Sequence, residues 1–315
     1  MLLLTLPIIS CALAPSPFRV PLSGLTVTNA DALWALDQYQ SAPVSGVTPE
    51  SIDTTFCRAG GSQKSPKLLF LHGADSNALE FRHVMRALTN DDGVECISLD
   101  WWSGGFTDRA PITAELVKQP TPPRPWTLVN KHIHAFWQQQ LDAEPLILVG
   151  TSLGGAVAID FAAAHPEAVS SLILIDAGGQ SYKSPSPDAV TALAPVVLQI
   201  KRVAAFVQER LPAEDVRLVA LHRSQPGWLE AGAEYLRSGS YQRRVGPELI
   251  RTVPMSTLVI WGADDDILPV EDAAAFERDL PNCAAVEVIP GSGHSPHLDN
   301  PTAVVEIFRK FLAGL

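Results

Sequence analysis

The sequence predicts an α/β fold in which a mostly parallel sheet carries helices on both faces. From residue 67 onward, short apolar runs alternate with segments of helical periodicity, which is typical of parallel strands joined by crossover helices. The runs are apolar at successive positions, as expected for strands buried between two layers of helices. The 315 residues, 46% hydrophobic and 18% charged, are consistent with one large core that carries an insertion.

Six apolar runs and several amphipathic segments define the expected elements. Phe81, Val84, Met85 and Leu88 share one face of a helix, because they are spaced at i, i+3, i+4 and i+7. The first 65 residues are less regular, with a strand expected over 54–57 and a helix over 30–40. The other strands are predicted over 67–72, 94–99, 145–149, 172–175, 257–261 and 285–289, and the other helices over 128–140, 153–164 and 303–312.

Between residues 178 and 254 the strand pattern stops. Val197, Ile200 and Val203 indicate one apolar helical face, and proline and glycine residues divide the stretch into short segments. Because apolar strand patterns resume after residue 254, we predict that residues 178–254 form a helical cap. The cap would be inserted into an α/β core made of residues 21–177 and 255–315.

The chain begins with an apolar stretch, residues 1–14. It is shorter than the roughly 20 residues that a membrane-spanning helix needs, and Pro7 interrupts it, so no stable membrane span is predicted. Ala12-Leu13-Ala14 has the small-x-small pattern of a signal-peptidase site, which predicts a targeting segment over residues 1–20 for a secretory or plastid route. No Lys or Arg precedes it. The alternative is therefore an apolar start of a cytoplasmic protein.

Charge and cysteine content exclude several classes of partner and cofactor. The net charge of −11 argues against binding to nucleic acid, which requires a basic surface. Four cysteines without a Cys-x-x-Cys spacing predict neither a disulfide framework nor structural zinc. The expected partner is a small-molecule substrate, and the sequence leaves the oligomeric state open.

A Gly-x-Ser-x-Gly motif, residues 150–154, lies between a predicted strand and a predicted helix. A turn this sharp tolerates no side chain two positions before or after the serine, and Gly150 and Gly154 meet that requirement. Ser152 is therefore expected at the carboxyl edge of the sheet. A serine hydroxyl is a poor nucleophile unless a histidine takes its proton and an acid orients that histidine.

Candidates for the acid and the base follow the last two predicted strands. The segment Trp261-Gly262-Ala263-Asp264-Asp265-Asp266 follows one strand, and Pro290-Gly291-Ser292-Gly293-His294 follows the next. With these motifs the chain resembles the α/β-hydrolase superfamily in its serine-nucleophile, esterase-like branch. Through Leu71-His72-Gly73-Ala74-Asp75-Ser76 and Gly293-His294-Ser295-Pro296-His297 it is also similar to plant and algal members. The resemblance maps the acid onto Asp265 and the base onto His294.

Other residues remain alternatives for these two roles. Asp264 and Asp266 adjoin the predicted acid, and some relatives place the acid after the preceding strand, where this chain has Asp176. His297 lies three residues after the predicted base and is expected to make a loop contact. The remaining histidines, among them His134, are interpreted as structural, because the sequence shows no convergent set of metal ligands.

The resemblance also assigns the turn His72-Gly73-Ala74 to an oxyanion hole. Its donors would be the backbone N–H groups of Ala74 and Leu153, and His72 is expected to stabilise the loop. Asp75-Ser76 is expected to cap the following helix, and a polar role at the mouth of the pocket is the alternative. Finally, Trp101 and Trp102 replace the smaller residues usual in the family, and one of the two is expected to line the substrate pocket.

A serine at position 152 favours acyl chemistry over attack by a carboxylate on an alkyl carbon. The resemblance implies a serine hydrolase that cleaves an ester or thioester of a small or apolar acyl group through an acyl-enzyme, with no metal or organic cofactor. The alternatives with the same fold are a carbon–carbon bond hydrolase and a cofactor-free haloperoxidase-like enzyme. An alternative of another class is a ligand-binding receptor or scaffold with little turnover.

Overall fold

A computed structural model describes residues 14–22, 24–61, 66–102, 104–118, 125–180, 213–237 and 245–315. Most of the targeting segment predicted over residues 1–20 lies outside these ranges. So do residues 181–212 and 238–244 of the predicted cap.

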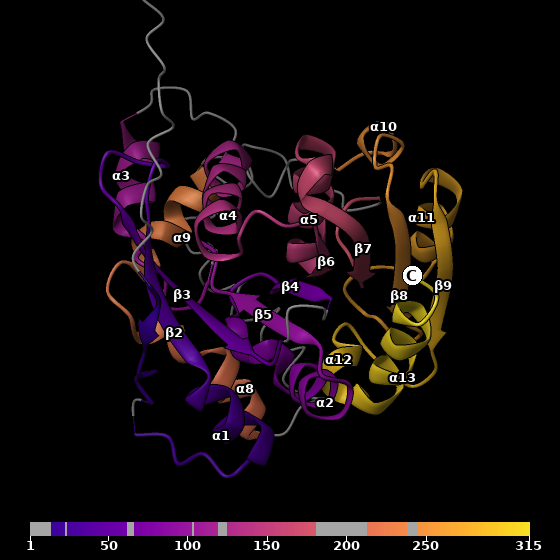
Figure 1. The fold of residues 1–315 in the computed structure, drawn as a ribbon, viewed down its shortest axis with the longest axis horizontal. Helices are drawn as coiled ribbons and strands as arrows, with labels where there is room; N and C mark the ends of the chain where they lie inside the picture. Colours follow the sequence, from indigo (N-terminus) through magenta and orange to yellow (C-terminus); the bar gives the residue numbers. More distant parts are fainter. Residues whose placement is uncertain are drawn as a thin grey trace, which may run out of the picture.

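The described residues form one nine-stranded sheet with the order β1-β2-β3-β5-β4-β6-β7-β8-β9 (Figure 1). Six strands, β5, β4, β6, β7, β8 and β9, are parallel to one another. The pairs β1–β2, β2–β3 and β3–β5 are antiparallel. The strands are β1 (Ser16–Pro17), β2 (Tyr39–Val44), β3 (Ile52–Ala59), β4 (Lys67–Leu71), β5 (Glu95–Leu99), β6 (Leu146–Thr151), β7 (Val169–Ile175), β8 (Ser256–Gly262) and β9 (Cys283–Ile289).

The six predicted parallel strands are confirmed to within three residues at either end, and the strand expected over 54–57 belongs to β3. The helix expected over 30–40 is shorter than predicted. It begins after Asn29 and ends at Asp37. The side chain of Asn29 accepts hydrogen bonds from the backbone N–H groups of Asp31 and Ala32. Strand β2 starts at Tyr39, where pairing with Cys57 of β3 outweighs the local helical pattern.

Helices cover both faces of the sheet, and the strand side chains alternate between two apolar layers. In β4, Leu69 and Leu71 point into one layer, whereas Leu68 and Phe70 point into the other. The first layer includes α3 (Ala110–Val117), α4 (Pro125–Gln140), α5 (Ser152–Ala164), α10 (Pro247–Ile250) and α11 (Glu271–Asp279). The second includes α1 (Ala30–Asp37), the 3-10 turn η1 (Ala78–Phe81), α2 (Arg82–Asp92) and α13 (Pro301–Leu312) (Figure 1).

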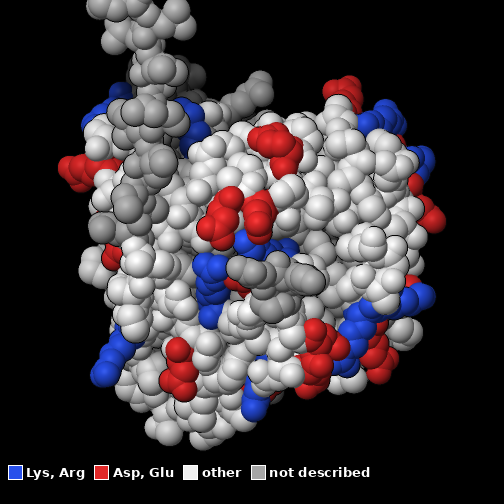
Figure 2. Space-filling view, in the orientation of Figure 1, with Lys and Arg blue, Asp and Glu red and all other residues white. Residues whose placement is uncertain are grey.

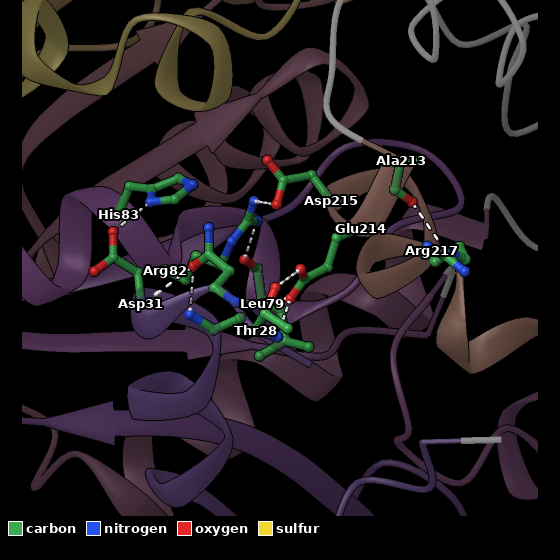
Figure 3. A network of polar contacts seen from close by, with 11 residues as sticks. Thr28, Asp31, Leu79, Arg82, His83, Ala213, Glu214, Asp215 and Arg217 are labelled. Atoms are coloured by element: carbon green, nitrogen blue, oxygen red, sulfur yellow. Dashed lines mark hydrogen bonds and ion pairs between the residues drawn. The ribbon is translucent and has the colours of Figure 1, made fainter. Parts of the chain in front are cut away.

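The described part of the predicted cap is helical and is held on the core by charged contacts. Arg82 of α2 forms a 2.6 Å ion pair with Asp215, and both side chains are buried. Glu214 accepts the backbone N–H groups of Thr28 and Asn29 (Figure 3). The elements described within residues 178–254 are α8 (Ala213–Val219), the 3-10 turn η4 (Leu221–Ser224), α9 (Trp228–Arg237) and α10, which packs on the core helices α5 and α11. The cap boundaries at 178 and 254 stay a prediction.

The surface carries charges of both signs. On the face shown in Figure 2, acidic and basic side chains of the described residues are interspersed and form no extended basic area. Within the described ranges, none of the helices combines the length and the apolar character that crossing a membrane requires.

Candidate active site

The turn between β6 and α5 places Ser152 in a backbone conformation that few residues adopt. Ser152 has a φ of 51°, in the left-handed region. A Cβ atom at Gly154 would lie 2.1 Å from the carbonyl oxygen of Leu71, and one at Gly150 would lie 2.4 Å from that of Gly154. Contacts this short with backbone atoms exclude any side chain, so both glycines of the motif are required for the turn to form.

Ser152, His294 and Asp265 are in hydrogen-bond contact at the carboxyl edge of the sheet. The Nε2 atom of His294 lies 2.9 Å from Oγ of Ser152, and its Nδ1 atom lies 2.7 Å from Oδ2 of Asp265. Ser152, His294 and Asp265 follow β6, β9 and β8; β8 and β9 are neighbours in the parallel sheet, and β7 lies between β6 and β8. When Nδ1 donates to the carboxylate, Nε2 is left as an acceptor for the serine hydroxyl.

The Asp265 carboxylate is fixed by its own loop as well as by the histidine. Its Oδ1 atom accepts the backbone N–H groups of Ile267, at 2.8 Å, and Leu268, at 3.0 Å. Burial would raise the pKa of Asp265, but the hydrogen bond and the charge of His294 outweigh burial and lower it. Asp265 therefore stays ionised, whereas Asp264 and Asp266 are exposed on the same loop.

Asp176, the other alternative for the acid, lies at the end of β7 beside this pair. Its Oδ1 atom accepts the backbone N–H of Gly262 at 2.9 Å, and its carboxylate lies within 4.8 Å of the polar atoms of Asp265 and His294. Burial, and secondarily the nearby charge of Asp265, raise the pKa of Asp176 well above its ordinary value. The histidine bonds directly to Asp265, whose pKa is lowered, whereas burial favours the neutral form of Asp176.

The turn after β4 lies against the nucleophile. Leu71 at the end of β4 pairs with Gly150, and a Cβ atom at Gly73 would lie 3.4 Å from Cβ of Ser152. The N–H of Gly73 is occupied, because it donates to Glu80 at 3.0 Å. The next N–H along the chain belongs to Ala74, which is exposed. The N–H of Leu153 is in the first turn of α5, where backbone donors have no acceptor within the helix.

Sequence analysis missed Glu80, which forms a second histidine–carboxylate pair near Ser152. Its Oε1 atom lies 3.0 Å from Nε2 of His297, and both side chains are buried. Burial would raise the pKa of Glu80, but the hydrogen bond and charge of His297 outweigh it and lower the pKa to about 2. The signal that could have identified this residue is a charged side chain within the apolar run Ala78–Phe81. His297, expected to make only a loop contact, thus has a buried acidic partner.

The prediction that Asp75 caps the following helix is wrong. Asn77 caps η1 instead, because its side chain accepts the backbone N–H of Leu79 at 2.9 Å. The Asp75 carboxylate points to the cap, where Nε2 of His222 lies 2.9 Å from Oδ1. A residue directly after the predicted oxyanion donor therefore contacts a segment 147 residues further along the chain.

Both tryptophans predicted near the pocket are buried in one apolar layer. Trp101 is completely buried, stacks on the ring of His72 and donates its indole N–H to the carbonyl oxygen of His72 at 3.2 Å. Trp102 is 1% exposed and belongs to the same apolar layer. A pocket-lining role for either residue stays a prediction. Nδ1 of His72 lies 2.8 Å from the carbonyl oxygen of Gly73, which stabilises the turn as expected.

Two histidines that sequence analysis treats as separate structural residues come together with an acid. His134 of α4 and His165 after α5 stack at 4.1 Å between ring centroids, with Glu167 beside them. One potential ligand atom from each lies within 4.8 Å of the others. The rings are only 17° from parallel, so their in-plane lone pairs run side by side rather than converge on one ion.

Comparisons with known proteins agree with this architecture. Residues 68–307 match the alpha/beta hydrolase family. The chain is 31% identical over 264 residues to the alpha/beta hydrolase domain-containing protein VTE7 of Arabidopsis thaliana, covering 80% of this chain and 75% of VTE7. It is 25% identical over 289 residues to human monoacylglycerol lipase ABHD6, covering 84% and 80% of the two chains.

The fold is also similar to that of solved structures. An esterase from Thermogutta terrifontis superposes with a TM-score of 0.69 at 23% identity, covering 87% of this chain and 98% of the esterase. The sheet order, the turn at Ser152 and the family match over residues 68–307 lead to one conclusion. The chain belongs to the α/β hydrolase family and is a hydrolase.

Proposed function

We propose that this hydrolase cleaves carboxylic esters through a Ser152–His294–Asp265 triad. The observation that carries the proposal is the continuous hydrogen-bonded path from Ser152 Oγ through His294 to Asp265. The path begins at a serine in a strained turn between a strand and a helix. A serine in such a turn, hydrogen-bonded to a histidine, is activated for attack on an acyl carbon.

Each of the three side chains has a defined task in the proposed reaction. His294 takes the proton from Ser152 as the serine oxygen bonds to the ester carbonyl carbon, and the N–H groups of Ala74 and Leu153 stabilise the resulting oxyanion. His294 then protonates the leaving alcohol, and the acyl group stays on Ser152. Water, deprotonated by the same histidine, releases the acid. Asp265 holds the imidazole in its tautomer and stabilises its charged form.

The acyl substrate is proposed to be small or apolar. Human ABHD6 is named a monoacylglycerol lipase, and the Thermogutta relative is named an esterase, which favours an ester bond. The side chain of Leu153, next to Ser152, packs against the apolar layer that includes Trp101 and Trp102, which favours an apolar acyl group. A monoacylglycerol or another ester of an aliphatic acid has the matching chemistry.

A hydrolysis panel tests the proposal. We expect the purified protein to hydrolyse p-nitrophenyl esters and monoacylglycerols, with rates that depend on acyl length and exceed those on vinylogous diketones, the substrates of carbon–carbon bond hydrolases. The Ser152→Ala variant serves as the matched control for background hydrolysis. Turnover of the diketones alone, or equal rates for the wild type and the variant, would contradict the proposal. Saturable binding of these esters without turnover would instead indicate a receptor.

A further inference from the structure

The turn that follows β4 is attached to the cap through the carboxylate of Asp75. Oδ1 of Asp75 accepts a hydrogen bond from the indole N–H of Trp228 at 2.9 Å and lies 2.9 Å from Nε2 of His222. Oδ2 forms an ion pair with Arg223 at 2.8 Å. One carboxylate of the core therefore contacts three cap side chains, from η4 and the start of α9.

The Asp75 carboxylate is held in its charged form at this position. Burial would raise the pKa of Asp75, but the hydrogen bond from His222 and the charges of His222 and Arg223 lower it. The side chain of His222 is completely buried, so its ring cannot exchange this contact for water. The three contacts act on a charged group that is itself largely buried, where hydrogen bonds are stronger than at the surface.

The backbone of Asp75 links these contacts to the neighbouring peptide. Asp75 has a φ of 53°, in the left-handed region, which aspartate adopts more readily than most residues. Ala74 directly precedes it and carries the N–H that the proposed mechanism uses. The N–H of Gly73, on the other side of Ala74, is fixed by Glu80. The Ala74 peptide is thus held from the core side by Glu80 and from the cap side by Asp75.

A second residue of the same turn also bonds to the cap. The side-chain amide of Asn77 donates to the carbonyl oxygens of Leu218, at 2.9 Å, and Val219, at 3.0 Å. These carbonyls are at the end of α8, just before η4. The turn from Asp75 to Asn77 and the cap from Leu218 to Trp228 therefore form one hydrogen-bonded unit.

We propose that Asp75 is a positioning residue through which the cap sets the oxyanion-stabilising N–H of Ala74. The inference rests on the proposed function. In this arrangement the cap contributes to the rate of the chemical step as well as to substrate binding. Loss of the Asp75 contacts leaves the Ser152–His294–Asp265 path intact and releases the Ala74 peptide from the geometry that stabilises an oxyanion.

The Asp75→Asn variant separates charge from backbone conformation, because asparagine also tolerates the left-handed region. We expect kcat for a p-nitrophenyl ester to fall by about 10- to 100-fold with KM nearly unchanged, since a displaced donor costs less than the 10²- to 10³-fold effect of removing one. Inhibition by an alkyl boronic acid, which forms a tetrahedral adduct on the serine, should weaken by the same factor. Binding of the product acid, which forms no tetrahedral adduct, should change little.

The same effect should be produced from the cap side. Arg223→Gln and Trp228→Phe each remove one partner of Asp75, at residues outside the triad and the oxyanion turn. Each should lower kcat and boronic acid affinity together, and each should be non-additive with Asp75→Asn, since all three changes break one set of contacts. Glu214→Ala is the matched control. It removes a contact between cap and core at Thr28, away from the turn, and should leave kcat unchanged.

The results distinguish this inference from the proposed function. If the wild type hydrolyses esters and Asp75→Asn and Trp228→Phe retain full kcat and boronic acid affinity, the positioning role is wrong while the proposed function stands. An inactive wild type would refute the proposed function instead. Changes in KM alone would show that the cap contacts affect substrate binding only, and would also overturn the inference.

Discussion

The two sides of Ser152 are built in different ways. On one side, His294 pairs with Asp265, 29 residues away in sequence and in the loop after the adjacent strand. On the other side, His297 of the same segment pairs with Glu80, 217 residues away, and Glu80 holds the turn after β4. The first side depends on neighbouring strand ends. The second depends on contacts among the turn, the C-terminal segment and the cap.

This difference separates the making of the nucleophile from the stabilisation of charge. The local side can activate the Ser152 hydroxyl with three loops of the sheet alone. The long-range side carries the N–H of Ala74, and Glu80 and the cap residues contact the turn to which that N–H belongs. Variants on the two sides should therefore differ in how far they lower kcat. Variants on the long-range side should also change the free energy of unfolding.

The largest effect is expected on the local side, from Ser152→Ala. Removal of the nucleophile should reduce kcat by about 10⁶-fold, as for other serine hydrolases of this mechanism. The free energy of unfolding should change little, because alanine keeps the Cβ atom that the turn already accommodates and the change removes only the part-buried hydrogen bond to His294. Steady-state hydrolysis measures kcat, and urea unfolding measures the free energy of unfolding. Residual activity above one hundredth of wild type would place the nucleophile elsewhere.

The next largest effect tests the acid. Asp265→Asn should lower kcat by about 10⁴-fold, since the amide favours the wrong tautomer of His294. Asp264→Asn is the matched control on the same loop and should retain activity, because Asp264 is exposed. Comparison of kcat for the two variants decides the assignment. The reverse pattern would move the acid by one position.

A smaller effect is expected on the long-range side, from Glu80→Gln. Glutamine has the size of glutamate but lacks its charge, so the bonds to Gly73 and His297 should weaken without opening a cavity. We expect kcat to fall by about 10-fold or more, below the cost of removing an oxyanion donor outright. Steady-state kinetics on a p-nitrophenyl ester, which give kcat and KM, measure this effect. An unchanged kcat would show that the turn is held without Glu80.

The smallest effect concerns stability and its dependence on pH. The pKa of Glu80 falls from an ordinary value of 4.5 to about 2 on folding, so its ionised form stabilises the protein by about 3 kcal/mol above pH 5. This contribution is lost as the pH falls from about 5 toward 2. The difference in unfolding free energy between wild type and Glu80→Gln should therefore shrink over that range in urea titrations. A difference that is independent of pH would contradict the lowered pKa.

The sequence predicts the local side well and the long-range side poorly, for physical reasons. The strands from β4 to β9 and the turn at Ser152 follow from apolar runs and two glycines, which act over a few residues. Ser152 and His294 are 142 residues apart as well, but each lies in a motif that indicates its role. Asp75 and Glu80 have partners 147 and 217 residues away, and no motif in the sequence shows which partner they contact. The sequence does not predict strand β2, because the pairing of β2 with β3 ends the preceding helix and the residues of β2 show no strand pattern of their own.

The most direct test of Ser152 as an activated nucleophile is intact-mass spectrometry after reaction with a fluorophosphonate. The wild type should gain the mass of one phosphonyl group, and peptide mapping should place that group on Ser152. The Ser152→Ala variant, shown to have the same melting temperature as the wild type, should gain no phosphonyl group. Labelling of the variant to the same extent, or an unlabelled wild type that nevertheless hydrolyses esters, would contradict the assignment of Ser152 as the nucleophile.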